Sequence, residues 1–129
     1  MYRTENGKQN AFTFVELMVV LAIVALMLTI ALPRYFSGLE RAKEAVLKED
    51  LFTMREAIDN YHVDKGQYPP DSLQTLVDDR YLRSIPIDPI TESSETWIVI
   101  GLPQNPTLVY DVRSGAEGEA SDGTLYYEW

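Results

Sequence analysis

Residues 11–32 read AFTFVELMVVLAIVALMLTIAL, and this stretch decides the architecture of the chain. From Phe12 to Leu32 it contains a single charged residue, Glu16. At about 1.5 Å per helical residue the segment is roughly 30 Å long, which is the thickness of the hydrocarbon core of a bilayer. The stretch therefore predicts a helix that spans a membrane.

The position of Glu16 inside this apolar run predicts that the helix does more than anchor the chain. An ionised side chain at depth in lipid costs on the order of 3 kcal/mol, so an unpaired carboxylate is a poor choice for a plain anchor. Cleavage between Ala11 and Phe12 would create an amino group about one helical turn from Glu16. In an array of staggered parallel helices, that cation can neutralise the glutamate of a neighbouring chain.

Residues 1–11 have the composition of a processing leader. They are short and polar, carry Arg3 and Lys8, and end in the small residue Ala11 directly before the apolar run. A standard secretory signal is cut after its apolar region, whereas a cut here would leave the helix on the mature chain. We therefore expect a cleaved leader (1–11), a membrane and assembly helix (12–33) and a soluble domain (34–129). The alternative is an uncleaved signal anchor with a stray acid.

The composition excludes several classes of function. The chain has no cysteine, so disulfides, thiolate metal sites and cysteine nucleophiles are absent. A formal net charge of −9 argues against nucleic acid as a partner. His62 is the only histidine, next to Tyr61, and we expect it at the surface. Because no hydrolase elbow, HExxH or phosphate loop occurs, we expect no catalytic activity.

The helical pattern continues beyond Pro33, which we expect to bend the helix without ending it. Apolar residues then recur at helical spacing to about His62, and charged residues, among them Glu44, fall on the other faces. Gly66 and the Pro69-Pro70 pair predict the end of the helix. The predicted packing stripe is Leu47, Leu51, Met54, Ile58 and Tyr61.

The rest of the chain predicts a small α+β domain. Asp71 and Gln74 form a capping pair for a short helix over 72–79. Residues 97–100 and 107–112 predict a hairpin, which must lie on the long helix or recruit 125–129 as a third strand. Residues 114–123 form an acidic, glycine-rich loop with hard oxygen ligands, including Glu117 and Asp122, that suit Ca²⁺. The alternative is an ordinary solvated turn.

The segment AFTFVELMVV resembles the type III signal of type IV pilin-like proteins, with Phe12 first and Glu16 fifth in the mature chain. Ala11 replaces the usual glycine before the cut. The soluble part resembles the major pseudopilin of type II secretion systems, the G class. The residues that carry this second resemblance are Tyr61, Asp64, Gly66, Tyr68-Pro69, Leu73, Leu76-Val77, Tyr81-Leu82, Pro86 and Asp88-Pro89.

The resemblance implies a pilin-like α+β fold and a structural role. The chain would be cut by a prepilin peptidase and N-methylated at Phe12. Held in the bacterial inner membrane with its domain in the periplasm, it would polymerise into a helical filament. Minor pseudopilins and an inner-membrane assembly platform would be its partners. The growing filament would help to push folded proteins across the outer membrane.

The resemblance also implies roles for residues of the soluble domain. Asp59 and Arg83 match positions that form a salt bridge between neighbouring subunits of the G class, and the alternative is two exposed side chains, with Asp59 paired to Arg55 in its own helix. A calcium site would use carboxylates at Glu117 and Asp122 and oxygens around Ser114.

Two other functions stay open at this stage. One is a subunit of a type IV pilus or competence filament. The other is a membrane-anchored periplasmic binding module that works as a monomer. Assembly state separates the monomer from the two filament functions, because only the filament subunits form polymers.

Overall fold

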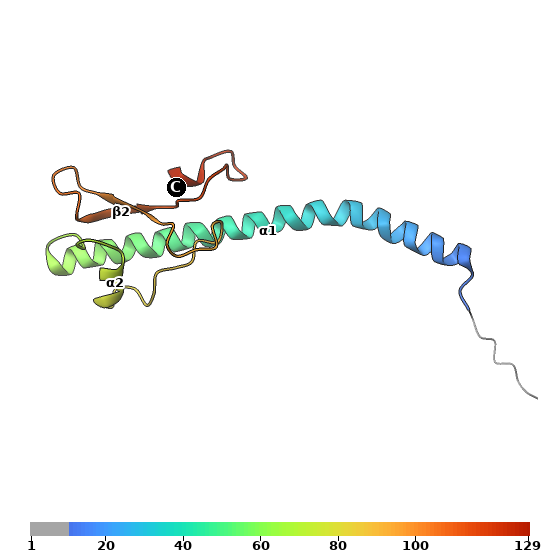
Figure 1. The fold of residues 1–129 in the computed structure, drawn as a ribbon, viewed down its shortest axis with the longest axis horizontal. Coiled ribbons are helices and arrows are strands. Elements are labelled where there is room, and N and C mark those ends of the chain that lie inside the picture. The colour runs from blue at the N-terminus through green and yellow to red at the C-terminus, as the bar shows by residue number, and fades with distance from the viewer. Residues whose placement is uncertain (1–10) are drawn as a thin grey trace, which may run out of the picture. The chain divides into compact units, whose positions relative to one another are not determined.

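The computed structural model describes residues Ala11–Trp129 and has the predicted α+β architecture (Figure 1). A long helix is followed by a short helix, a two-stranded antiparallel sheet and one turn of 3₁₀ helix. The elements are α1 (Phe14–Lys65), α2 (Gln74–Asp78), β1 (Ile98–Gly101), β2 (Val109–Arg113) and η1 (Tyr126–Glu128).

Helix α1 has a clear signal at each end. The Thr13 hydroxyl accepts the backbone N–H of Glu16 at 3.1 Å, which satisfies one of the free donors of the first turn. Gly66 has a φ of 73°, a left-handed conformation that suits glycine and stops the helix after Lys65. The helix therefore runs three residues beyond the predicted end at His62 and continues without a break through Pro33.

The chain divides into two units between Gly38 and Leu39. In the first unit, every residue from Ala11 to Gly38 is exposed. The apolar side chains from Phe14 to Leu32 expose between 46% and 76% of their surface. This part of α1 is long and apolar enough to cross a membrane, by length and composition.

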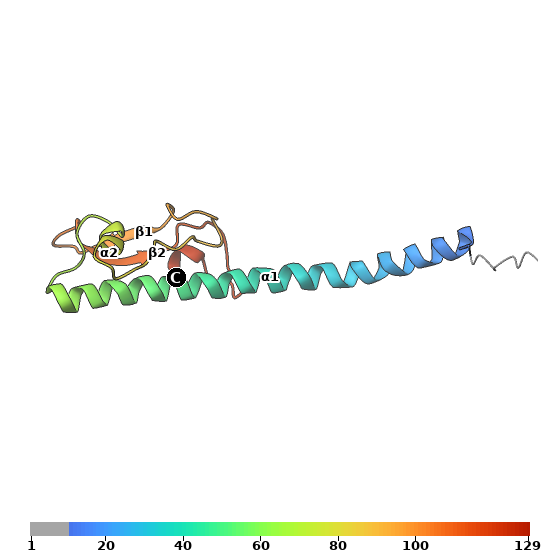
Figure 2. The same cartoon turned by 90° about the horizontal axis from the view of Figure 1, so that it is seen from below.

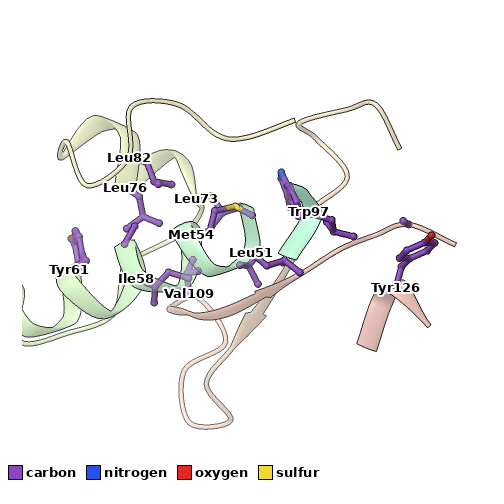
Figure 3. Close-up of a cluster of buried hydrophobic side chains, with 14 of the residues drawn as sticks. Leu51, Met54, Ile58, Tyr61, Leu73, Leu76, Leu82, Trp97, Val109 and Tyr126 are labelled. Atoms are coloured by element: carbon purple, nitrogen blue, oxygen red, sulfur yellow. The ribbon is translucent and has the colours of Figure 1, made fainter. Parts of the chain in front are cut away.

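The second unit contains the hydrophobic core (Figure 3). The predicted stripe on α1 is confirmed, since all five of its members are buried. Leu73 and Leu76 pack on the stripe from the region of α2, and Val109 and Val112 pack on it from β2. The remaining buried apolar residues are Ala57, Leu82, Trp97, Ala116, Ala120 and Tyr126.

The sheet lies on α1, as expected for a hairpin too small to be stable alone (Figure 2). Ile98 pairs with Arg113, and the register shifts between Ile100 and Gly101. A single bridge from Pro70 to Leu108 continues the pairing on the far side of β2. Both strands begin one or two residues later than predicted, over 98–101 and 109–113.

One of the two alternatives for the hairpin is not formed, and one local prediction was wrong. Residues 125–129 form no third strand; they contain η1 and make one bridge, from Leu125 to Glu119. Asp71 does not cap α2, because it has a φ of 69° and lies before the helix. The Ser72 hydroxyl instead accepts the N–H of Gln74 at 3.3 Å, and α2 is shorter than predicted.

Candidate functional site

The predicted cleavage point lies immediately before α1. Ala11 and Phe12 are outside the helix and exposed, and the Phe12 side chain retains 78% of its accessible surface. A peptide bond in this position is open to a protease, whereas bonds inside α1 are protected by the helical hydrogen bonds. The ten residues before Ala11, including Arg3 and Lys8, lie outside the described residues.

Glu16 occupies the third position of α1, on a surface that is otherwise apolar. Among residues Ala11–Trp129, its carboxylate has no ion pair and no hydrogen bond. The spacing from Thr13 to Glu16 is that of a capping box, a local signal that the sequence analysis missed. Only the half in which the Thr13 hydroxyl accepts the Glu16 N–H is formed, so the carboxylate stays available to a partner.

Pro33 lies inside α1 and has no N–H to donate to the carbonyl of Thr29, four residues earlier. One turn below, the Thr29 hydroxyl donates to the carbonyl of Leu26 at 2.6 Å. A hydroxyl bonded back to the helix in this way often accompanies a bend. The bend predicted at Pro33 stays a prediction.

Asp59 and Arg83 are both exposed in the second unit. The predicted alternative, a pair between Arg55 and Asp59, is not formed. Arg55 instead donates to Asp111 at 2.9 Å, which is the ion pair found among the described residues. Asp59 and Arg83 therefore have no charged partner within residues 11–129.

Glu44 holds the C-terminal segment (residues 114–129) against α1, a role that the sequence analysis missed. Its side chain is only 7% exposed, although we expected it on a solvated face. Its Oε1 accepts the Ser121 N–H at 2.6 Å and the Tyr126 hydroxyl at 3.1 Å, and its Oε2 accepts the Ser121 hydroxyl at 2.5 Å. Glu44 is three residues before Leu47, so the apolar stripe itself placed it on the core face.

The ionisation of this cluster follows from its contacts. Burial alone would raise the pKa of the Glu44 carboxyl, but the hydrogen bonds from Ser121 and Tyr126 outweigh burial and lower the pKa below its ordinary value. Burial and the bond to the Glu44 carboxylate raise the pKa of Tyr126 to about 12. At neutral pH the cluster is therefore a carboxylate with three donors.

Two cations on α1 hold the same segment. Lys48 places its ammonium 4.5 Å from the centre of the Trp129 ring, a cation–π contact. Arg55 donates to the carbonyls of Trp129 and Val112 at 2.5 Å and 2.9 Å. Glu44, Lys48 and Arg55 are spaced four and seven residues apart, so they lie along one side of the helix.

The three predicted calcium ligands have separate surroundings. Ser114 is fully buried, and its hydroxyl donates to Asp88 at 2.5 Å. Asp122 is exposed and accepts both the N–H and the hydroxyl of Thr124, which lowers its pKa. Glu117 is also exposed.

The structure does not test the calcium site, which was predicted from two carboxylates and oxygens around Ser114. Residues 11–129 contain no group of three or more acidic or histidine side chains placed to hold a metal ion. The loop is shaped by its own backbone: Gly118 and Gly123 have left-handed φ values, and a Cβ on Gly115 would lie 2.1 Å from the Thr96 carbonyl oxygen. Calcium binding stays a prediction that needs a direct test.

His62 is half-buried rather than at the surface as expected. Its ring stacks on Tyr68 with centroids 4.1 Å apart and an interplanar angle of 9°. Its Nδ1 is buried without a hydrogen-bond partner in the part of the chain that the structure describes.

Comparison with known proteins places the chain in a family. Residues 6–32 match the prokaryotic N-terminal methylation motif. The type II secretion system core protein G of Pseudomonas aeruginosa is 31% identical over 100 residues, covering 66% of this chain and 70% of that protein. The chain belongs to the type II secretion core protein G family. The Escherichia coli protein of the same name is 27% identical over 65% of this chain and 68% of its own.

Pilins are related as well. The fimbrial protein EcpC of Eikenella corrodens is 28% identical over 93% of this chain and 81% of its own length. This similarity does not favour the pilus subunit over a core protein G. No solved structure gave a significant match to the chain.

Proposed function

We propose that this chain is the structural subunit of a type II secretion pseudopilus and polymerises through the apolar half of α1. One observation carries the proposal: within residues 11–129 Glu16 has no partner, and it lies on a helix whose residues are all exposed between Phe14 and Leu32. A neighbouring chain in a filament supplies both things that this helix lacks, which are apolar cover and a cation.

The cation for Glu16 is the amino group released by processing. A prepilin peptidase cuts between Ala11 and Phe12, and the new amino terminus at Phe12 is N-methylated. The match of residues 6–32 to the methylation motif and the exposure of Ala11 and Phe12 support this step. Methylation leaves the amine charged, so it still pairs with a carboxylate.

Before assembly the subunit is held in the inner membrane by α1, with the second unit in the periplasm. Arg3 and Lys8 precede the span, and positive residues stay on the cytoplasmic side. The minor pseudopilins and the inner-membrane assembly platform are the expected partners. The role is structural, and the filament helps to drive folded proteins through the outer membrane.

In the filament, Asp59 of one subunit meets Arg83 of the next. Both side chains are exposed, and the competing partner Arg55 is held by Asp111. A single exposed pair contributes about 0–1 kcal/mol, so its effect depends on repetition along the filament.

The proposal is tested by the change Glu16→Ala in cells that carry the peptidase and the secretion system. We expect normal membrane insertion, because removing a charge from a spanning helix favours lipid, and loss of filaments and secretion. Glu56→Ala is the matched control, since Glu56 is exposed on the same helix. Normal filaments from Glu16→Ala would refute the role of this carboxylate.

Mass spectrometry of the mature chain tests the processing step. We expect the amino terminus at Phe12 with one added methyl group. An amino terminus at Met1 would favour the uncleaved signal anchor. A processed chain that stays monomeric in the presence of the full system would favour a membrane-anchored binding module.

A further inference from the structure

A hollow on the surface of the second unit exposes an aromatic side chain of α1. Phe52 retains 62% of its accessible surface and lines a hollow of about 370 Å³ together with Lys48, Leu51, Arg55 and Trp129. Most of this lining is carbon. An exposed aromatic ring beside an apolar hollow is typical of an interaction surface, unlike a single apolar residue on a flat face.

A second hollow in this unit is lined by two carboxylates and shares one residue with the first. Arg55 lines both, and the second, of about 220 Å³, is also lined by Asp59, Tyr68, Tyr110 and Asp111. Asp111 forms an ion pair with Arg55, whereas Asp59 has no ion pair within residues 11–129. We call the two hollows together the groove; its lining is mostly apolar around Phe52 and carries Asp59 in the second hollow.

The connector between α2 and β1 presents the complementary pair, an arginine and an exposed aliphatic side chain. Ile87 is 63% exposed, although both of its neighbours are fixed. The Pro86 carbonyl accepts the indole N–H of Trp97 at 2.7 Å, and Asp88 is fully buried and donates its N–H to Ser93 at 3.0 Å. These two hydrogen bonds hold the backbone on either side of Ile87, and the Ile87 side chain is left exposed.

The sequence separations of the two pairs allow both contacts to form at once. Phe52 and Asp59 are seven helical residues apart, or about 10 Å along the axis. Arg83 and Ile87 are four residues apart, so they span up to about 13 Å in extended chain. We propose that Ile87 of a second copy of this chain docks beside Phe52 in the apolar hollow while Arg83 of that copy meets Asp59.

The charges and the arrangement of the elements favour a second copy as the occupant. Each chain has a net charge of −9, so two copies repel unless a cation of one meets an anion of the other. The connector that leaves α2 and the groove are made of different residues, because the groove is lined by residues of α1 and β2 together with Tyr68 and Trp129. Contacts between unlike surfaces do not pair off into closed dimers and can continue into a filament.

The docking proposal rests on the proposed function for the contact between Asp59 and Arg83. It adds an apolar contact, Ile87 with Phe52, that fixes how neighbouring copies are aligned. The absence of native cysteine allows a direct test. Two differently tagged copies, one carrying Phe52→Cys and the other Ile87→Cys, are expressed together with the secretion system and oxidised within assembled filaments. A disulfide between the two tags can form only between chains.

We expect several-fold more mixed dimer from this pair than from Val63→Cys with Ile87→Cys. Val63 is the matched control because it is also an exposed apolar residue of α1, at 79%, but does not line the groove. Equal yields from the two pairs in assembled filaments would overturn the docking proposal alone. Absence of filaments from the unsubstituted chain would overturn the proposed function and the docking proposal with it.

Substitution gives a second measurement that does not depend on disulfide geometry. Ile87→Lys should reduce the amount of filament several-fold, because it brings a cation beside Lys48 and Arg55 in the apolar hollow, whereas Ile87→Leu should not. Since Ile87 is exposed, both variants should melt at the same temperature as the unsubstituted chain. Normal filaments from Ile87→Lys would contradict the proposal.

Discussion

The hydrogen bonds that Glu44 accepts from the C-terminal segment lead to a quantitative prediction. Glu44→Ala should destabilise the soluble domain far more than the loss of an ordinary helix glutamate. The substitution removes the acceptor of three hydrogen bonds between α1 and the C-terminal segment. Glu44→Gln is the milder change, because it keeps the shape of the side chain and one carbonyl oxygen.

The loss of stability in Glu44→Ala depends on whether each former donor finds a new acceptor. Ser121 is exposed, so its two donors turn to water and each loses about 1 kcal/mol. The Tyr126 hydroxyl belongs to a residue that is only 4% exposed, and leaving it unpaired costs about 1–3 kcal/mol. The variant no longer buries a carboxylate, and the desolvation free energy that this saves offsets part of the loss. We expect Glu44→Ala to lower the free energy of unfolding by about 3 kcal/mol.

The assay is urea and thermal unfolding of the fragment from Arg34 to Trp129. Among the described residues, every buried side chain lies at or after Glu44, so this fragment contains the whole core. For a domain of this size, 3 kcal/mol corresponds to a fall of more than about 10 °C in the melting temperature. Glu44→Gln should cost about half as much, since hydrogen bonds to a neutral acceptor are about half as strong.

The pH dependence provides a second check. The pKa of Glu44 is lowered by folding, so its stabilisation is present above the ordinary value of 4.5 and is lost as the pH falls through the folded-state value. The difference between the unsubstituted domain and Glu44→Gln should therefore shrink below that pH. A cost for Glu44→Ala no larger than for Glu56→Ala, or one that does not change with pH, would refute the reasoning.

Three further predictions concern the same domain. The phenol of Tyr126 should titrate with a pKa of about 12 in alkaline absorbance measurements, and this pKa should fall towards the ordinary value in Glu44→Ala. The stability that Tyr126 contributes should be lost as the pH rises through about 12. Burial and two neighbouring carboxylates raise the pKa of Asp50, so its charge opposes folding at neutral pH, and Asp50→Asn should raise the melting temperature at pH 7 but not at pH 3. If Glu117 and Asp122 hold Ca²⁺, the melting temperature of the domain should be higher in Ca²⁺ than in chelator, and identical melting curves would reject the calcium site.

Local patterns predicted the long helix and its core face. The stripe from Leu47 to Tyr61 follows the helical period, so burial of each member depends on the helix alone. The end at Gly66 and the hairpin over residues 97–112 likewise have signals within a few residues. These elements were found because the interactions that form them are close in sequence.

The hydrogen bonds that join α1 to the C-terminal part of the chain have no local signal in the sequence. Glu44 bonds to residues 77 and 82 positions later, and Arg55 bonds to residues 56 to 74 positions later. A single sequence cannot show which distant donor will meet a helix glutamate. The same contacts distinguish the two alternatives for residues 125–129, because Tyr126 of η1 bonds to Glu44 of α1 and these residues add no strand to the sheet.

The distance in sequence between Glu44 and its donors has a consequence for the order of events during synthesis. The apolar half of α1 is complete long before Ser121 and Tyr126 have been made. Until they arrive, the core would have to close around an ionised carboxylate with no donors, which is costly. Contacts this far apart also form slowly, because a long loop must close first. The helix can therefore enter the membrane while the domain is still unfolded, and the domain completes its folding afterwards.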